Sequence, residues 1–517
     1  MSAAHGGAPA AILAYGLGVP ALAGAAAVLG FAPFYLWPVA IASLAALFLS
    51  WGRCETPRQA AISGYAFGLG LNLAGVSWVY VSLHEFGHMP APLAAIATFL
   101  FCAYLALFPA AAGWAARRLA PPAGLAGALA MAGCFVLAEW VRGWLFTGFP
   151  WLAIGYTQVP ASPLAGFAPV LGAYGVSLAV GVAAACLAAA MGSFAWSRER
   201  GIALAALAAV LGAGALLKLP AWTEPAGPPV TVSLLQGNVS QHLKWRDEVR
   251  AATLDDYASM TLASRAKVVV LPETALPAFL DQLPPGYLDS LAADARGQGR
   301  DILLGAVERR FAGERFEYFN SVVTRGASPP QSYRKRHLVP FGEFIPPGFG
   351  WVLAVLKIPL TDFGRGAPNQ PPLEAGGTTW GVAICYEDIF GEEVIDALPR
   401  AAILVNVSND AWFGESLAAD QHLQFSQMRA LETGRWMVRA TNTGVTAAID
   451  ERGRVVSRLP GFVKGTLEAS PVPRAGSTPY VRWGNAPALV LAALATAAVL
   501  LRRPGRWPAR DAGGRGR

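Results

Sequence analysis

The sequence predicts a polytopic α-helical membrane domain followed by an α/β domain, and three observations support this prediction. Of the 517 residues, 54% are hydrophobic and only 14% are charged, which is too apolar for an ordinary soluble protein. Long apolar runs fill the chain up to Leu219. Between Val230 and about Glu468, short β-like runs alternate with polar helical patterns instead. The chain is long enough for more than one domain.

The apolar part contains eight runs, most of them near the ~20 residues that a helix needs to cross the hydrocarbon. We therefore predict a membrane domain of seven transmembrane helices over residues 1–219, a proline-rich linker over 220–229, an eighth transmembrane helix over 484–502 and a basic tail over 503–517. The runs are about Ala8–Leu29, Leu36–Trp51, Ala60–Ser82, Pro92–Ala116, Gly124–Arg142, Gly166–Gly192, Ile202–Leu219 and Asn485–Leu501.

Arginine placement predicts the orientation of these helices. Basic residues follow each even-numbered run and are nearly absent after the first, third and seventh runs. By the positive-inside rule the even-numbered exits are cytoplasmic, so both termini lie inside and the α/β domain lies outside. The first run lacks a basic segment before it and is followed by further spans, so we do not interpret it as a signal peptide. The residues concerned are Arg53 and Arg58, Arg117 and Arg118, Arg198 and Arg200, and Arg502, Arg503, Arg506 and Arg510.

The second domain spans residues 230–470 and is large enough to build its own core. Expected strands are Val230–Leu235, Lys267–Leu271, Ile302–Ala306, Ser321–Thr324, Thr379–Ile384, Ile403–Val407 and Thr446–Ile449. Expected helices are Asp247–Arg265, Tyr287–Gly297, Glu392–Leu398 and Gln421–Arg435.

Aromatic residues gather at the expected outer boundary of the membrane, at Trp78 and Tyr80 and in the loop Trp140–Gln158. They are either interfacial anchors or a rim that receives lipid headgroups. Glu139 and Arg142 are three residues apart on a helix, so they are expected to pair with each other.

Cys385 is the only one of five cysteines in the polar part of the chain, and it ends the apolar run Val382–Ile384. The cysteine spacing fits neither a zinc site nor a disulfide scaffold. Cys385 is therefore either a small buried hydrophobe or a nucleophile held at a strand end. Glu273 and Lys335 also follow or end strand-like segments. A carboxylate can take the thiol proton, and an ammonium group can stabilise the oxyanion that forms.

Other chemistry is less well supported by the sequence. His337 or His422 could pair with Cys385 in a protease-like dyad, but neither has the matching flanking pattern. The six histidines are scattered without ligand spacing, so no metal site is expected. The arginine runs are explained by membrane topology, which leaves no indication of nucleic-acid binding.

The motifs around these residues resemble a known triad. Leu271-Pro272-Glu273, the segment Tyr333–Glu343 and Cys385-Tyr386-Glu387 resemble the Glu-Lys-Cys triad of the nitrilase superfamily. In their longer forms they are similar to its membrane-anchored branch, the apolipoprotein N-acyltransferase family. The similarity extends over nearly the whole chain, and includes Gly30–Phe34, the Trp140–Trp151 loop, Gln236–Asn238 with Trp245, Tyr318–Ser321, Ser408–Gly414, Gln421-His422 with Arg429, and Arg439 with Asn442–Gly444.

This resemblance implies an αββα nitrilase-like sandwich on the outer face of the bacterial inner membrane. It implies Glu273 as the general base, Lys335 as the oxyanion stabiliser and Cys385 as the nucleophile. Accessory or substrate-binding positions would be Trp245, Asn320, Glu343, Tyr386, Glu387 and Trp412.

The activity implied is a ping-pong acyl transfer. A phospholipid, typically phosphatidylethanolamine, would acylate Cys385, and the thioester would pass its chain to the α-amino group of a diacylglyceryl-cysteine in a lipoprotein. The resemblance implies no cofactor and no metal, and we expect a monomer.

Two alternatives remain: a membrane-tethered amidase or nitrilase acting on a small amide, and a polytopic transporter with an outer receptor domain. The apolar loop Pro346–Gln370 is expected to be a lid, a membrane-dipping arm or a segment tucked into the core.

Overall fold

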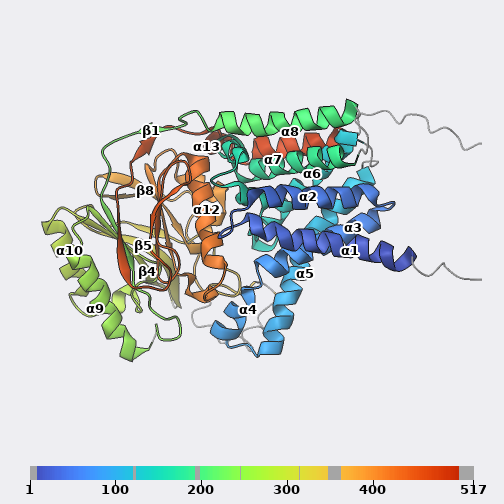
Figure 1. Ribbon diagram of the computed structural model, residues 1–517. Helices are drawn as coiled ribbons and strands as arrows, with labels where there is room; N and C mark the ends of the chain where they lie inside the picture. Colours follow the sequence, from blue (N-terminus) through green and yellow to red (C-terminus); the bar gives the residue numbers. More distant parts are fainter. Residues whose placement is uncertain are drawn as a thin grey trace, which may run out of the picture.

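The computed structural model describes residues 8–119, 124–192, 198–244, 246–313, 315–346, 348 and 362–499. An elongated bundle of apolar helices forms one end of the molecule and an α/β domain forms the other (Figure 1). The fold class predicted from the sequence is thereby confirmed.

The bundle consists of long helices that run side by side (Figure 1). The helix α3 begins at a capping box, in which Thr56 and Gln59 each bond the other's backbone N–H, and Pro57 occupies its first turn. The long helices are α1 (Ala8–Ala27), α2 (Trp37–Arg53), α3 (Pro57–Gly75), α5 (Ala91–Leu119), α6 (Gly124–Arg142), α7 (Ala168–Met191), α8 (Arg198–Leu217) and, after the α/β domain, α14 (Ala486–Ala497).

Four described helical segments are long and apolar enough to cross a membrane: Ala91–Leu119, Gly124–Arg142, Pro163–Met191 and Arg198–Leu217. A fifth candidate is the pair Pro57–Gly75 and Val79–Phe86, which is bent by 59°. The third apolar run of the sequence is therefore broken after Gly75 and continues through α4 (Val79–Val81). The last helix, Ala486–Ala497, is short in the described part of the chain, so the expected total of eight spans stays a prediction.

The α/β domain is a sandwich of two six-stranded sheets. Buried side chains from both sheets, among them Val270, Trp380 and Val405, form the core between them. The first sheet has the order β13-β2-β3-β4-β5-β6, with β13 (Gly465–Ala469), β2 (Val232–Gln236), β3 (Val268–Leu271), β4 (Asp301–Ala312), β5 (Arg315–Gly326) and β6 (Ser332–Arg334). The second has the order β12-β11-β10-β9-β8-β7, with β12 (Val455–Arg458), β11 (Ala447–Ile449), β10 (Met437–Thr441), β9 (Ile403–Ser408), β8 (Thr378–Ile384) and β7 (Leu373–Ala375).

Helices cover the outer face of each sheet and complete four αββα layers. The first sheet packs against α9 (Asp247–Ala263) and α10 (Tyr287–Gly297). The second packs against α11 (Gly391–Val394) and α12 (Ala418–Thr433). A short ribbon of β1 (Glu224–Pro225) and β14 (Arg474–Ala475), with α13 (Pro479–Trp483), connects the sandwich to the bundle.

The helix α12 joins the two parts of the molecule, because it lies between the second sheet and the membrane helices (Figure 1). Phe425 and Met428 on α12 share one buried cluster with Trp151 and Tyr156 of the bundle. Gln421 Oε1 accepts hydrogen bonds from Trp151 Nε1 at 2.6 Å and from Trp78 Nε1 at 3.4 Å. Polar side chains of α12 are therefore buried against the bundle, and the sandwich is held in a defined position over it.

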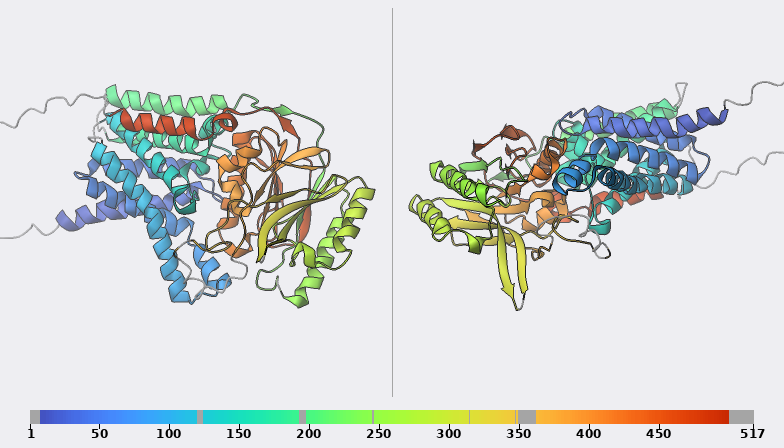
Figure 2. Two further views of the ribbon diagram at one scale, coloured as in Figure 1. Left: turned by 180° about the vertical axis from the view of Figure 1, so that it is seen from behind. Right: turned by 90° about the horizontal axis from the view of Figure 1, so that it is seen from below.

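The strands β4 and β5 are longer than the sequence indicated. They pair over twelve residues each, from Asp301 with Gly326 to Ala312 with Arg315. The hairpin, yellow in Figure 2, projects beyond the sandwich.

The strand β10 was not expected from the sequence, although all five of its residues are buried. Most of the loop Pro346–Gln370 lies outside the described residues, so its role stays a prediction.

Candidate active site

Cys385 lies directly after β8, where the backbone leaves the sheet in a short turn over Cys385–Ile389. Its backbone φ angle is +52°. Residues other than glycine rarely adopt this value unless the surrounding structure imposes it. Its carbonyl accepts hydrogen bonds from Asn406 Nδ2 at 3.1 Å and His422 Nε2 at 3.2 Å. The structure therefore holds this thiol in a strained and fixed orientation at the edge of the sheet.

Glu273 and Lys335 reach the same place from the other sheet. Glu273 follows β3 and Lys335 follows β6, and both side chains are buried. Lys335 Nζ lies 3.3 Å from Glu273 Oε1 and 2.9 Å from Glu343 Oε1. Both Glu273 and Lys335 are close enough for their charges to act on the thiol of Cys385. The three residues that the sequence singled out are thus brought together between the two sheets.

Asn320 and Glu343 fix the positions of these two charges. Asn320 Nδ2 donates to Glu273 Oε1 at 2.7 Å and to Glu343 Oε1 at 2.9 Å, and the amide N–H of Asn409 donates to Glu273 Oε2 at 2.9 Å. An ammonium group has three donors and a carboxylate about four acceptor positions. Among the described residues, Lys335 therefore keeps one N–H, and Glu273 one lone pair, for the reacting groups.

The electrostatics assign different protonation states to the lysine and the thiol. Burial would lower the pKa of Lys335, but the carboxylates of Glu273 and Glu343 outweigh it and hold this pKa above its usual range. Burial raises the pKa of Cys385, Glu273 raises it further, and Lys335 only partly opposes them. The resting pair is an ammonium group and a neutral thiol, so the thiol needs a base before it can attack.

Glu387 connects the lysine segment to the cysteine segment. Its carboxylate accepts hydrogen bonds from the amides of Ile384 and Arg336, each at 2.7 Å, and from Tyr333 Oη at 3.2 Å. It therefore fixes the backbone on both sides of the site. Its contacts support a positioning role.

Tyr386 connects the site to the bundle. Its hydroxyl donates to the carbonyl of Gly148 at 3.1 Å, and its ring is stacked with Trp151 at 6.4 Å between centroids. His337 Nε2 lies 3.0 Å from the carbonyl of Thr147, in the same loop. The loop after α6 therefore borders the site.

Of the other predicted accessory residues, Trp412 lies farther out and Trp245 lies outside the described residues. Trp412 is half-buried, and its carbonyl accepts a hydrogen bond from Ser82 Oγ at 2.7 Å. Its ring lies 6.0 Å from that of Phe86. Trp412 therefore sits where the sandwich meets the helical turn Ser82–Phe86 that directly follows α4.

A second ionic network lies beneath Cys385, and the sequence did not predict it as a unit. His422 bonds Asp410 Oδ1 at 2.8 Å and Asp388 Oδ1 at 3.0 Å. Arg439 bonds Asp410 Oδ2 at 2.8 Å and Asp388 Oδ2 at 3.3 Å. Burial and Arg439 lower the pKa of His422, but the two carboxylates raise it to about 9. This histidine is an imidazolium between two carboxylates, so it is unsuited to act as the base of Cys385.

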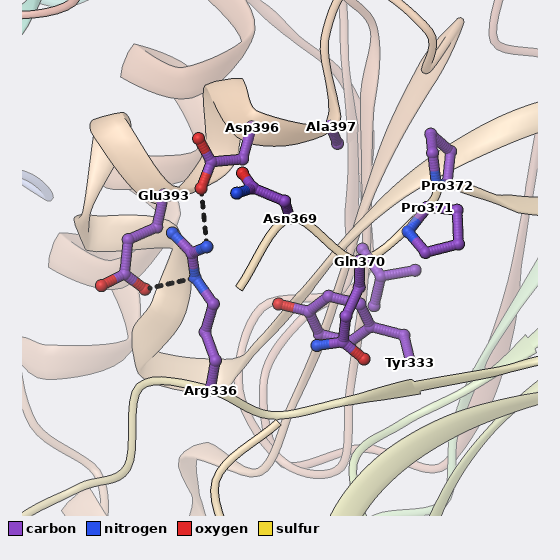
Figure 3. A pocket seen from close by; sticks show the side chains of 10 residues that line it. Tyr333, Arg336, Asn369, Gln370, Pro371, Pro372, Glu393, Asp396 and Ala397 are labelled. Atoms are coloured by element: carbon purple, nitrogen blue, oxygen red, sulfur yellow. Dashed lines mark hydrogen bonds and ion pairs between the residues drawn. The ribbon is translucent and has the colours of Figure 1, made fainter. Parts of the chain in front are cut away.

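Two cavities lie near the site, and neither contains the three central residues. One, of about 20 Å³, is bordered by Tyr333 and by Arg336, which pairs with Glu393 and Asp396 (Figure 3). It has room for about one water molecule. The other, of about 370 Å³, lies between α3–α4 and the start of α12, and is lined by Ala74, Gly75, Ser77, Trp78, Val81, Glu415, Ser416 and Leu417. No group of side chains suited to a metal ion occurs among the described residues.

Comparison with known proteins assigns the chain to a family. A family model for the apolipoprotein N-acyltransferase N-terminal domain matches residues 23–186, and one for carbon-nitrogen hydrolase matches residues 231–479. The apolipoprotein N-acyltransferase of Nitrosomonas europaea is 52% identical over 92% of this chain and 93% of its own length. The chain belongs to the apolipoprotein N-acyltransferase family.

A second curated relative agrees with this membership. The apolipoprotein N-acyltransferase of Methylococcus capsulatus is 46% identical over 90% of this chain and 91% of its own length. A solved carbon-nitrogen hydrolase from Helicobacter pylori is similar at 19% identity and a TM-score of 0.35, covering 47% of this chain and 88% of that one. The resemblance derived from the motifs is confirmed, and the chain is a membrane enzyme of the carbon-nitrogen hydrolase superfamily.

Proposed function

We propose that this enzyme transfers a fatty acyl chain from a phospholipid, phosphatidylethanolamine in the first instance, to the α-amino group of a lipoprotein's diacylglyceryl-cysteine. The name shared by its relatives supports this activity. The observation that carries the residue assignment is the meeting of Glu273, Lys335 and Cys385 between the two sheets, directly over the loop that follows α6.

In the first half-reaction Glu273 takes the proton of Cys385, and the thiolate attacks the acyl ester carbonyl of the phospholipid. The free N–H of Lys335 stabilises the tetrahedral oxyanion. Glu273 then returns the proton to the leaving glycerol oxygen, and the acyl chain remains on Sγ as a thioester. The neutral resting thiol makes this base necessary, because a thiol attacks far more slowly than its thiolate.

In the second half-reaction Glu273 takes a proton from the incoming α-amine, which attacks the thioester. Lys335 again stabilises the oxyanion, the C–S bond breaks and an amide forms. Glu273 returns the proton to the thiolate and restores the resting enzyme. Asn320 and Glu343 hold Glu273 and Lys335 in place through both steps.

The position of the site fits two lipid-anchored substrates. Tyr386, next to the nucleophile, bonds the loop after α6, and the apolar cavity beside Trp78 lies at the junction of bundle and sandwich. We propose that the acyl chains and the lipoprotein anchor lie along this junction and that the sandwich is on the periplasmic side. Reporters fused in the linker 220–229 should then behave as periplasmic, and the opposite result would overturn the orientation.

The experiment that tests the activity uses the full chain in detergent with phospholipid labelled in one acyl chain. Label should appear on Cys385 as a hydroxylamine-sensitive thioester and move to a diacylglyceryl peptide when the peptide is added. An amidase acting on small amides would instead hydrolyse an amide substrate without acquiring label from phospholipid, and that result would reject the proposal.

A further inference from the structure

The loop Gly143–Gly148, which follows α6, is held by two side chains of the sandwich. The carbonyl of Thr147 lies 3.0 Å from His337 Nε2. The next carbonyl, that of Gly148, accepts a hydrogen bond from Tyr386 Oη at 3.1 Å. A carbonyl oxygen can only accept, so Nε2 of His337 is the donor. Two consecutive carbonyls of one bundle loop are therefore bonded from the same side.

His337 and Tyr386 connect this loop to both parts of the reaction centre. His337 comes two residues after Lys335, and Tyr386 directly follows Cys385. The two rings also contact each other edge to face, with 5.8 Å between their centroids. The position of the loop relative to the thiol is thus set by the neighbours of the lysine and of the nucleophile.

The loop needs such contacts, because its backbone is strained. Phe146, Thr147 and Gly148 have φ values of +53°, +76° and +83°. Such values are uncommon for residues other than glycine, and most of all for a β-branched residue such as Thr147. The base of the loop is closed by the amide of Phe149, which donates to the carbonyl of Arg142 at 2.9 Å. At its far end the loop is fixed by the sandwich.

The outer side of the loop presents large apolar rings. The side chain of Phe146 is 79% exposed and that of Trp144 is 51% exposed. Both directly follow α6, a helix long and apolar enough to cross a membrane, so they lie at the boundary of the bilayer. Exposed rings at this depth are suited to contact the acyl chains of a phospholipid.

His337 has a second contact, which would anchor its ring even without the loop. Its Nδ1 lies 2.8 Å from Glu393 Oε1, and Glu393 also pairs with Arg336 at 3.1 Å (Figure 3). The contact with the loop and the contact with Glu393 use different ring nitrogens, so substitutions can separate them.

We propose that His337 is a positioning residue that holds the loop Gly143–Gly148 against the reaction centre, so that a donor phospholipid lying on the exposed rings is placed at Cys385. This inference rests on the proposed function, because it assigns a binding role for the acyl donor. His337 acts through the loop and takes no part in proton transfer. Its loss should weaken the use of phospholipid and leave the reactivity of the thiol unchanged.

The test compares two amides that each replace one ring nitrogen. Asparagine places its amide nitrogen near the position of Nδ1 and glutamine near that of Nε2, so His337→Asn keeps the contact with Glu393 and His337→Gln keeps the contact with the loop. We measure thioester formation on the full chain against the mole fraction of phosphatidylethanolamine in detergent micelles. In His337→Asn the mole fraction for half-maximal rate should rise about fivefold, the effect of one lost hydrogen bond. His337→Gln should remain near the wild-type value. Alkylation of Cys385 by iodoacetamide, which needs no lipid, should be unchanged in both variants.

The opposite order, with His337→Gln impaired and His337→Asn normal, would show that only the contact with Glu393 matters and would overturn the proposal. So would an equal fall in alkylation and acylation, which would mean a purely structural role. If His337→Asn does not fold, Phe146→Ala tests the same loop: a raised half-maximal mole fraction with normal alkylation supports the proposal, and an unchanged value overturns it. Phe311→Ala, at a phenylalanine of β4 that is 64% exposed, is the matched control and should change neither rate. A wild-type enzyme that forms no thioester would overturn the proposed function together with this inference, whereas normal thioester formation in every variant would overturn this inference alone.

Discussion

Two buried ionic clusters lie on either side of Cys385, and they differ in how completely their hydrogen bonds are used. In the described part of the chain, the reactive cluster of Glu273, Lys335, Glu343 and Asn320 keeps a free N–H on Lys335, and Asn320 Oδ1 is buried without a partner. The supporting cluster, Asp388, Asp410, His422 and Arg439, is almost fully paired, and only Arg439 Nε lacks a partner among its described side-chain atoms.

This difference indicates different roles for groups of similar chemistry. Unused donors and acceptors in a buried site are costly unless a reacting group occupies them, so they support the proposal that the chemistry occurs at this cluster. A paired cluster has nothing left to offer a substrate. It instead holds the strained backbone of Cys385, whose carbonyl it contacts through His422.

The largest expected effect is the loss of the nucleophile. Cys385→Ala removes the sulfur that would carry the acyl chain, so no thioester should form and overall acyl transfer should fall by about 10⁶-fold, as in other enzymes that lose their nucleophile. Cys385→Ser should be nearly as inactive, because an alcohol is a much weaker acid than a thiol. Gel-based detection of labelled acyl-enzyme measures both. The fold should be unchanged, since Cys385 bonds the supporting cluster through its backbone carbonyl; substantial turnover by the alanine variant would exclude a covalent mechanism.

Breaking the supporting cluster should affect stability more than chemistry. Arg439→Met leaves Asp388 and Asp410 buried with His422 as their only cation in the cluster, which should cost about 3–5 kcal/mol in the free energy of unfolding. Thermal unfolding of the full chain in detergent measures this effect. Arg458, exposed and loosely paired with Asp420, serves as the control, and Arg458→Met should have little effect. Equal losses in the two variants would contradict the role assigned to the cluster.

The residues of the reactive cluster could be predicted from the sequence, whereas the pairing in the supporting cluster could not. Glu273, Lys335 and Cys385 are each weak signals alone, but each lies at or near a strand end within a distinctive motif, so the family resemblance could single them out. Asp388, Asp410, His422 and Arg439 come from four separate segments, and their pairing depends on how the second sheet and α12 are arranged. The strand β10 was missed for a related reason, because Arg439 interrupts its apolar pattern and is satisfied only by tertiary contacts.

Removing one charge of the reactive cluster should slow both half-reactions. Loss of an oxyanion donor costs about 10²–10³ in rate, and loss of a general base costs a similar factor. Lys335→Ala and Glu273→Gln should therefore form the thioester slowly and also transfer it slowly. Mass spectrometry after incubation with phospholipid alone, and then with acceptor peptide, separates the steps. A variant that is fully acylated and blocked only at transfer would show that the residue does not serve both steps.

The supporting cluster should also give stability a defined dependence on pH. Because the pKa of His422 is raised from 6.5 to about 9 in the folded protein, its contribution is fully present below pH 6.5 and is lost as pH rises toward 9. The shift corresponds to about 3 kcal/mol at most. Thermal unfolding between these two pH values should show a falling midpoint in the wild type and a flatter profile in His422→Gln. A wild-type midpoint that rises over this range would mean that His422 is neutral in the folded protein.

The smallest effect should come from the boundary between the sandwich and the bundle. Trp412 lies outside both ionic clusters, next to the helical turn Ser82–Phe86 after α4 and beyond hydrogen-bond contact with Glu273 and Lys335 in the described structure. We therefore expect Trp412→Ala to form the thioester at a nearly normal rate but to bind the lipoprotein acceptor less well, by about tenfold, roughly the contribution of one aromatic contact. Such a variant should accumulate acylated Cys385 at low peptide concentration and recover at high concentration. Trp483→Ala, at an exposed tryptophan of α13, controls for the loss of a large ring. If Trp412→Ala slowed thioester formation as much as transfer, Trp412 would contribute to binding of the donor lipid or to the reactive cluster. Its role would then not be limited to binding of the lipoprotein acceptor.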